Sequence, residues 1–284
     1  MSSRGSTTVA SYRWTGGALE LLDPAATTGP ESAADPGSAP DSTIEVADSW
    51  LVTDGTALAL PLHRSRFLTS IAARGFTLPG AEEFWDAAVA TIPRNGDWFP
   101  RVELQSHNGT ALAAFRLREA PERGRSLVLA SHHGIDPRTA PRIKGPDLDA
   151  MQRIRAEAQQ RGAGEAVLLS PGGSVVDGAH TALLWWRGDI LCSPAPELDR
   201  VDSVTAKSTL TLAAALGVDI YHEDVAPTEL EGLEIWAVNA LHGIRIVTAW
   251  VDGPQTAEEP GRLTKWRTLL DRLRKPLPPA AVSP

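Results

Sequence analysis

The sequence predicts a mixed α/β (α+β) fold of two domains, in which helices flank mixed sheets whose strands are mostly joined by hairpins. One observation is a helical repeat of apolar residues that ends at a glycine, as in residues 61–75 and 146–162. Another is that strand-like segments outnumber helical ones in the second half and are separated by short turns such as PGG and RGD. The length of 284 residues, 42% of them hydrophobic, suits one large or two smaller cores.

Composition excludes several classes of protein. The formal charge of −8 and the lack of a Lys/Arg cluster argue against binding to a nucleic-acid backbone. No apolar stretch approaches the roughly 18 residues that would span a bilayer, and the N-terminus lacks the apolar core of a secretory signal, so we expect a cytoplasmic protein. A single cysteine, Cys192, excludes an internal disulfide and a Cys-rich zinc site. The pair His132-His133 lacks a third ligand at suitable spacing, so no metal site is predicted.

The first domain is predicted to be the smaller, α/β in type, and to cover residues 1–135. Residues 23–43 contain only Ala, Pro, Ser, Thr, Gly, Asp and Glu, and are predicted to be a mobile insertion. The elements expected in this domain are a short hairpin in 11–22, strands within 44–62 around an Asp54-Gly55 turn, helices over 61–75 and 81–92, and strands over 98–105, 111–118 and 126–131.

Residues 136–143 contain two prolines and no hydrophobic period, so we predict an interdomain linker there and a larger C-terminal domain over 144–284. Its expected helices cover 146–162, 203–217 and 262–275, the last with Leu263, Trp266, Leu270 and Leu273 facing inward. Its expected strands cover 165–170, 174–180, 182–186, 189–194, 218–223, 234–238 and 244–250.

The order of features after Lys144 carries further information. The lysine is followed by a helix, then GAGEAVLL, a strand segment VVDGAHTALLWW, a helix opening SVT, and a strand pair around VNALHGIRIV. This order resembles the class IV aminotransferases of pyridoxal-phosphate fold type IV, which include branched-chain and D-amino-acid aminotransferases and aminodeoxychorismate lyase. The resemblance is closest to the lyase-like branch, is specific over 144–250, and is weaker over 48–75, where ADSWLVTDG and LHRSRF lie.

The resemblance implies pyridoxal 5'-phosphate as the cofactor and Lys144 as the Schiff-base lysine and the catalytic residue. That role needs an amine with a lowered pKa, which also moves the substrate's alpha proton. It places Asp177 where the family has a glutamate that keeps the pyridine nitrogen protonated. Taken alone, Lys144 could be a solvated loop lysine, and Asp177-Gly178 could be a hairpin turn.

The resemblance also implies a phosphate site and a substrate site. A helix N-terminus offers backbone N–H groups to an anion, and arginine offers a charged fork. Each residue has a structural alternative, as a helix cap, a solvated helix face, a strand end or a surface ion pair. The implied cofactor-binding residues are Arg66, Lys144, Asp177, Ser203, Val204, Thr205, Asn239 and Ala240. The implied substrate-binding residues are Leu241, His242, Arg116 and Arg118.

These features predict a class IV aminotransferase that acts on an amino acid through the Lys144 Schiff base and alpha-proton removal. One alternative is an aminodeoxychorismate lyase that acts on an amino-chorismate and releases pyruvate and 4-aminobenzoate. Another is a non-catalytic homologue with weak or no cofactor binding, because Asp177, Ala182 and Ala206 depart from the family pattern. The resemblance further implies a homodimer.

Overall fold

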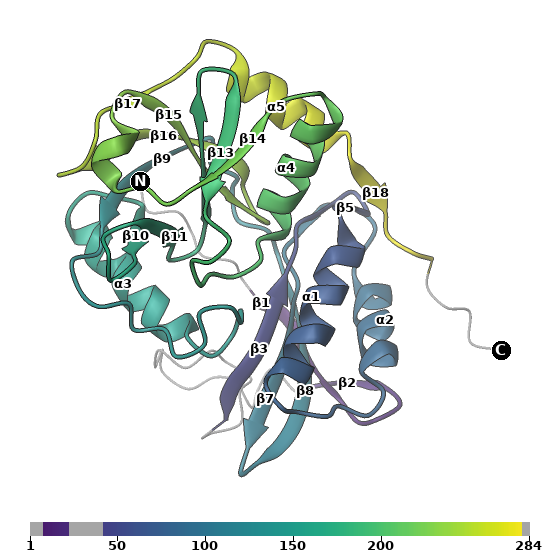
Figure 1. Ribbon diagram of the computed structural model, residues 1–284. Helices are drawn as coiled ribbons and strands as arrows, with labels where there is room; N and C mark the ends of the chain where they lie inside the picture. The colour runs from purple at the N-terminus through teal and green to yellow at the C-terminus, as the bar shows by residue number, and fades with distance from the viewer. Residues whose placement is uncertain (1–7, 23–41, 280–284) are drawn as a thin grey trace. The chain divides into compact units, whose positions relative to one another are not determined.

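The computed structural model describes residues 8–22 and 42–279. The insertion expected over 23–43 lies outside the described residues as far as residue 41, and a strand begins at Thr43. The chain divides into two compact units, shown in Figure 1. Unit 1 contains the described residues of Met1–Glu122, Lys144–Pro146 and Arg274–Pro284, and unit 2 contains Arg123–Ile143 and Asp147–Leu273.

Unit 1 consists of two antiparallel sheets and two helices. Among the described residues, the larger sheet has the strand order β2-β1-β8-β7-β3 and the smaller one has the order β18-β5-β4-β6. The strands are β1 (Thr8–Trp14), β2 (Leu19–Leu21), β3 (Thr43–Ser49), β4 (Val52–Thr53), β5 (Thr56–Leu58), β6 (Asp97–Trp98), β7 (Arg101–His107), β8 (Thr110–Arg118) and β18 (Arg274–Pro276). The helices are α1 (Leu60–Ala73) and α2 (Ala81–Thr91), which lie side by side against one face of the larger sheet in Figure 1.

The core of unit 1 is aromatic. Phe67 of α1 and Phe84 and Trp85 of α2 are at most 2% exposed, and they pack together with Trp50. The four-residue spacing of Phe67 and Ile71 puts both on the buried face of α1, as the helical repeat predicted. The predicted turn at Asp54-Gly55 is confirmed between β4 and β5, where both residues have positive φ.

Unit 2 contains a mixed sheet with the strand order β11-β10-β9-β16-β15-β12-β13-β14, and β17 pairs with β15. Its strands are β9 (Ser126–Ser131), β10 (Glu165–Leu169), β11 (Val175–Gly178), β12 (Ala182–Arg187), β13 (Ile190–Pro194), β14 (Ile220–Glu223), β15 (Leu233–Asn239), β16 (Gly243–Val251) and β17 (Thr256–Ala257). Hairpins join β10 to β11, β12 to β13 and β15 to β16, whereas β9 runs parallel to both β10 and β16. The predicted mixed α/β class is therefore confirmed.

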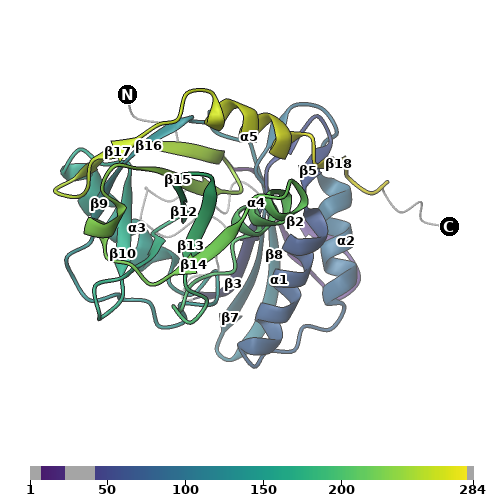
Figure 2. The same cartoon turned by 45° about the horizontal axis from the view of Figure 1, so that its top comes forward.

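Three α-helices and a short 3-10 helix accompany the sheet within the described part of unit 2: α3 (Leu148–Gln160), α4 (Val204–Ala215), α5 (Arg262–Asp271) and η2 (Pro227–Leu230). Helix α3 packs Met151, Ile154 and Ala158 against Ala130 and Leu168 of β9 and β10. A second cluster is built around Leu129, Trp185 and Ile235, and Figure 2 shows α5 running along β16.

The last predicted helix is only partly correct. Leu263, Trp266 and Leu270 are buried as expected, with Trp266 packed edge-on against Trp186 and Trp236. The prediction was wrong at the C-terminal end, because α5 stops at Asp271 and Leu273 is 40% exposed. Residues 274–276 instead form β18, which pairs with β5 of unit 1.

The two units differ from the predicted division at residues 136–143. Strand β9 groups with unit 2 because it pairs in parallel with β10 and β16. Lys144–Pro146 groups with unit 1, although the chain on both sides of it belongs to unit 2. Sequence periodicity cannot show that a segment of only three residues belongs to a different unit from its neighbours in the chain.

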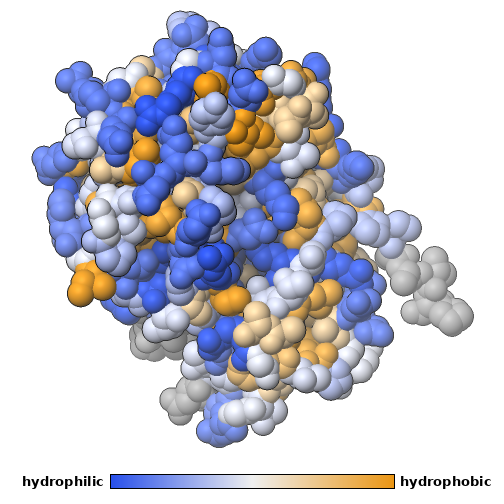
Figure 3. Space-filling model, in the orientation of Figure 1, coloured by the Kyte–Doolittle hydropathy of each residue, from blue (hydrophilic) through white to orange (hydrophobic). Residues whose placement is uncertain are grey.

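The surface in Figure 3 is mostly hydrophilic, with apolar patches scattered between polar ones. Isolated exposed apolar residues such as Ile135 and Tyr221 are normal for a folded domain. Within the described residues, no helix is long and apolar enough to cross a membrane.

The position of β9 in the core of unit 2 gives a stability prediction. Leu129 is 0% exposed, so Leu129→Ala should lower the free energy of unfolding by about 2–5 kcal/mol, through lost burial and a residual cavity. The control Leu273→Ala, at the exposed end of α5, should change it by less than about 0.5 kcal/mol. Urea unfolding followed by tryptophan fluorescence measures both, and equal effects would contradict the central position of β9.

Candidate functional site

The backbone of Lys144 is attached to β3. The Ala47 amide donates a hydrogen bond of 2.7 Å to the Lys144 carbonyl. The next residue, Gly145, has φ +149, and a Cβ there would lie 2.7 Å from the Val46 Cα. Only glycine therefore fits this close approach of two backbones.

A second set of bonds holds the chain on either side of Lys144. The buried Asp147 carboxylate accepts hydrogen bonds from the Thr139 amide and hydroxyl, each of 2.9 Å, and from the Ala140 amide at 3.0 Å. These bonds tie residue 147 to residues 139 and 140, so the intervening loop has fixed ends.

The Lys144 side chain is half-buried, and the pKa of its amine is lowered. Burial, together with the positive charge of Arg66, lowers the pKa of Lys144 from 10.5 to about 8, while Asp48 acts in the opposite direction. The guanidinium groups of Arg101 and Arg118 lower this pKa further. The Lys144 amine therefore has a neutral fraction at physiological pH that an exposed lysine lacks.

Asp48 is the buried counter-ion beside this lysine. Its carboxylate, which is 0% exposed, lies 2.7 Å from Nδ1 of His63 and accepts bonds of 2.8 Å from Nε and Nη2 of Arg66. Burial alone would raise the pKa of Asp48, but Arg66 and His63 outweigh it and hold that pKa far below its usual range. His63 and Arg66 lie three residues apart on α1, and the sequence did not predict that Asp48 would be their partner.

Arg116 and Arg118 lie on β8 in a second charged group. Arg116 is 1% exposed and donates from Nε to Oε1 of Glu103 at 2.9 Å. Arg101 also donates to Glu103, while Arg118 donates to the Phe99 carbonyl and the Ser49 hydroxyl. Burial lowers the pKa of Arg118 to about 9, so it remains cationic near neutrality.

Sequence reasoning missed Arg101 and Glu103. Their alternate positions on β7 put them on one face of the strand, and Arg101 is opposite Arg116 in the register of β7 and β8. Cationic side chains outnumber carboxylates among Arg66, Arg101, Arg116, Arg118, Lys144, Asp48 and Glu103. Such a set favours an anionic ligand.

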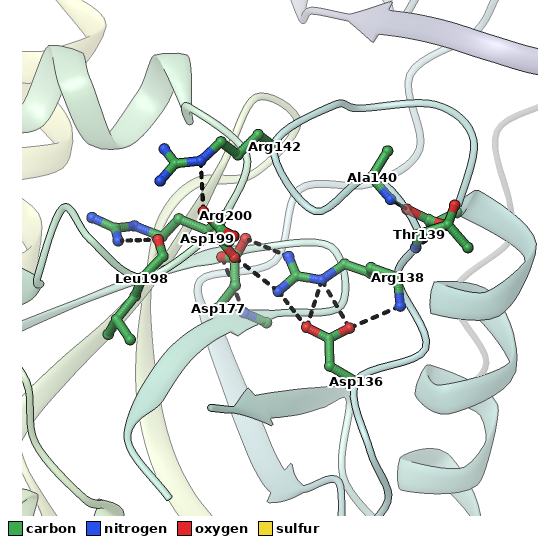
Figure 4. A network of polar contacts seen from close by, with 11 residues as sticks. Asp136, Arg138, Thr139, Ala140, Arg142, Asp177, Leu198, Asp199 and Arg200 are labelled. Atoms are coloured by element: carbon green, nitrogen blue, oxygen red, sulfur yellow. Dashed lines mark hydrogen bonds and ion pairs between the residues drawn. The ribbon is translucent and has the colours of Figure 1, made fainter. Parts of the chain in front are cut away.

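In unit 2, Asp177 lies on β11 and is 6% exposed. Its Oδ2 is 3.8 Å from Nη1 of Arg138, and its Oδ1 accepts a 3.1 Å bond from the Gly178 amide. Burial raises the pKa of Asp177 to about 7, although Arg138 and Arg200 act against this rise. Figure 4 shows Arg138 between Asp177 and Asp136, a contact that the sequence did not indicate.

Helix α4 begins at Val204, as the SVT segment predicted. Ser203 is its N-cap, and the Ser203 hydroxyl accepts a 3.2 Å bond from the Ala206 amide. The first turn of α4 contains no acidic residue, and Asp202, which precedes the N-cap, is paired with Lys207.

Residues Asn239 to Gly243 form the turn between β15 and β16. The Asn239 side-chain oxygen accepts a 2.8 Å bond from the His242 amide, while its side-chain amide donates to the His180 carbonyl. Nδ1 of His242 accepts a 3.1 Å bond from the Gly124 amide. Burial and the nearby Arg245 lower the pKa of His242 to about 3, so its ring is neutral at physiological pH.

The predicted site residues thus form groups within the two units. Lys144, Arg66, Arg116 and Arg118 belong to unit 1, where the charges of Arg66 and Arg118 act on Lys144. Asp177, Ser203 to Thr205 and Asn239 to His242 belong to unit 2. Among the described residues, no three His, Cys, Asp or Glu side chains gather as they would around a metal ion.

Comparisons with known proteins identify a family and similar folds. The family model described as amino-transferase class IV matches residues 45–250. No relative was found among the curated proteins.

Solved structures match nearly the whole chain in fold. A fold IV transaminase from Curtobacterium pusillum matches with a TM-score of 0.75 and 16% identity, covering 92% of this chain and 98% of that one. A hypothetical aminotransferase from Mycobacterium tuberculosis in its PLP-bound form matches with a TM-score of 0.73 and 17% identity, covering 93% and 98%. A putative 4-amino-4-deoxychorismate lyase from Legionella pneumophila matches with a TM-score of 0.69 and 14% identity, covering 81% and 91%.

The surroundings of Lys144 predict the effect of one substitution on its protonation. Arg66→Gln should raise the pKa of Lys144, because it removes the positive charge that opposes protonation and leaves the Asp48 carboxylate in place. The control Arg64→Gln removes a partly exposed arginine of the same helix that pairs with Glu82 and Asp86, and should leave the Lys144 pKa unchanged. NMR titration of ¹³C-dimethylated lysines measures both, and an unchanged pKa in Arg66→Gln would contradict this coupling.

Proposed function

Because the chain belongs to the amino-transferase class IV family, we propose that it transfers the amino group of an amino acid, with Lys144 as the catalytic lysine. Enzymes of this family depend on pyridoxal phosphate and are aminotransferases or lyases. The predicted family, fold type and cofactor are therefore confirmed. The reaction and the roles of single residues are proposals, supported by the geometry of each unit.

Each unit contains groups with the chemistry that a phosphorylated pyridine aldehyde requires. The half-buried Lys144 amine has a pKa of about 8, the buried Asp177 carboxyl has a pKa of about 7, and α4 offers a capped N-terminus without an acidic first turn. An amine suits the aldehyde, a carboxylate suits the ring nitrogen, and a helix N-terminus suits the phosphate dianion. When bound, the cofactor would withdraw electrons from the substrate's alpha carbon.

The setting of Lys144 carries the proposal: its carbonyl is bound by the Ala47 amide of β3, its side chain is half-buried, and its pKa is lowered. With a pKa of about 8, roughly a tenth of the amine is neutral at pH 7, compared with less than a thousandth for an unperturbed lysine. As a neutral amine, Nζ would accept the proton from the substrate's alpha carbon, and as an ammonium it would return one. A group with a pKa near the working pH can do both.

Asp177 would accept a hydrogen bond from the protonated pyridine nitrogen. Only the ionised carboxylate favours that protonated ring, and a carboxyl with a pKa of about 7 is about half ionised at neutral pH. Cofactor binding through Asp177 should therefore strengthen as the pH rises through about 7.

The phosphate would be bound by Ser203, Val204 and Thr205 at the start of α4 and by Asn239 and Ala240 in the turn before β16. Arg66 would add charge, although its guanidinium is already shared with Asp48. Leu241 and His242 of the same turn would contact the substrate, His242 as a neutral ring.

A carboxylate of the substrate would be attracted by the cationic set that contains Arg101, Arg116 and Arg118. Arg116 is fully buried and bonded to Glu103, so we assign it the role of holding this set in place, whereas Arg118 is only partly buried. An amino-acid substrate supplies the anionic group that such a set favours.

The second candidate function is aminodeoxychorismate cleavage. That substrate carries two carboxylates, and the predominance of cations over carboxylates around Lys144 suits a doubly charged ligand. The same lysine would remove the same kind of proton, so the products alone distinguish the two reactions. We also propose a homodimer, on the strength of the family resemblance.

Lys144→Ala should abolish both covalent labelling by the cofactor and turnover. The chain has four lysines, Lys144, Lys207, Lys265 and Lys275, so peptide mass spectrometry after treatment with pyridoxal phosphate and borohydride locates the label directly. The control Lys207→Ala removes an exposed lysine paired with Asp202 and should keep label and activity. A label on another lysine of fully active protein would overturn the assignment of Lys144.

Product analysis tests the reaction itself. With an amino acid and a 2-oxo acid acceptor, the proposed aminotransferase should produce the new amino acid in amounts far above those of the enzyme. With aminodeoxychorismate and no acceptor, it should release no pyruvate. Pyruvate and 4-aminobenzoate release, together with an absence of amino transfer, would replace the first function by the second.

A further inference from the structure

Asp177 is surrounded by charged groups from three parts of unit 2. Arg138 and its partner Asp136 approach from the loop after β9, Arg200 from the loop after β13, and Glu165 from β10. The Arg138 contact, 3.8 Å from Nη1 to Oδ2, is an ion pair with a side chain that is only 5% exposed (Figure 4). A buried carboxylate needs such a partner to remain charged.

Arg138 is itself held rigidly. Its Nε donates to both oxygens of Asp136, at 3.0 and 2.9 Å, and its Nη2 donates to Asp136 at 2.7 Å. A further bond of 3.1 Å joins Nη2 to the Asp199 carbonyl. The Arg138 amide also donates to Asp136 at 3.0 Å, so backbone and side chain are fixed together. These bonds leave the guanidinium in one orientation, with Nη1 directed at Asp177.

Arg200 has a different position. Its Nη1 and Nη2 donate to the carbonyls of Ala195, Leu198 and Pro194, at 2.6, 3.1 and 2.7 Å. Its charge helps to lower the pKa of Asp177, but its hydrogen bonds bind its own loop. Glu165, also buried, acts in the opposite sense because a second carboxylate disfavours ionisation of the first.

We propose that Arg138, fixed by Asp136, is a positioning residue that favours the ionised form of Asp177, the carboxyl group proposed to pair with the cofactor ring. The inference rests on the proposed role of Asp177 and extends it to the residue that sets its state. Without Arg138, only Arg200 would oppose the effects of burial and Glu165 on the Asp177 pKa, so the ionised fraction of Asp177 at physiological pH would fall. A neutral acid gives little support to a protonated pyridine.

The test measures non-covalent binding of pyridoxine 5'-phosphate to the cofactor-free protein from pH 6 to 9. This alcohol lacks the aldehyde and does not react with Lys144, and its own titration is common to all variants. Arg138→Gln should move the binding midpoint upward by about one pH unit, since an adjacent opposite charge lowers a carboxyl pKa by roughly 1–3 units. At pH 7 its affinity should be several-fold weaker, and it should recover at higher pH.

Three further variants separate charge from structure. Arg138→Lys keeps the charge and should have a midpoint close to that of the unaltered protein. Arg142→Gln removes an exposed arginine of the same loop that pairs with Asp199, and should leave the profile unchanged. Asp177→Asn should bind weakly and lack the pH step. Circular dichroism identifies any variant that does not fold, and ¹³C NMR of the carboxyl carbons, assigned by Asp177→Asn, follows the Asp177 pKa without ligand.

The outcomes distinguish two failures. If Arg138→Gln keeps the original midpoint and Asp177 pKa while Asp177→Asn loses the step, Arg138 has no such role and the proposed function stands. The inference is also overturned if Arg138→Gln binds weakly at every pH with an unchanged midpoint, since the residue would then be merely structural. If Asp177→Asn binds with the original affinity and profile, the assignment of Asp177 within the proposed function fails.

Discussion

The hydrogen bond from the Ala47 amide to the Lys144 carbonyl is the contact on which the proposed chemistry depends. It joins three residues, Lys144 to Pro146, to unit 1, while the chain before and after them belongs to unit 2. Gly145 permits this contact because any side chain there would collide with the backbone of β3. This attachment involves only backbone atoms of Lys144, and its side chain takes no part in it.

Burial lowers the pKa of Lys144 and raises the pKa of Asp177, so both values move toward pH 7. It disfavours the ammonium of the lysine and the carboxylate of the aspartate, so pKa values that normally lie at 10.5 and 3.8 become about 8 and about 7. Neighbouring charges then tune each group, with Arg66 adding to the effect on the lysine and Arg138 opposing it on the aspartate. Burial therefore suits Lys144 to the proposed role of proton carrier and also sets the charge state of Asp177, the proposed partner of the ring nitrogen.

Local patterns predicted most helices and strands because each depends on residues close in sequence. The glycine after α1 and the four-residue apolar spacing are local features, and the family resemblance singled out Lys144 and Asp177 as candidates. The partners of these residues could not be predicted in the same way. Glu103 meets Arg116 only through the register of β7 and β8, and Arg138 lies in an irregular loop without any period. Likewise, α5 ends early because residues 274–276 pair with β5, a contact more than 200 residues away.

The pairing of Arg66 with Asp48 limits how much Arg66 could contribute to the proposed phosphate site. A guanidinium that gives two hydrogen bonds to a buried carboxylate has much of its charge offset, and moving it would leave Asp48 buried without its partner. Arg66 therefore contributes less to an anion than a bare arginine would. Backbone amides do not face this conflict, because the start of α4 has no acidic residue in its first turn. In the proposed site, the phosphate would consequently depend more on Ser203 to Thr205 than on Arg66.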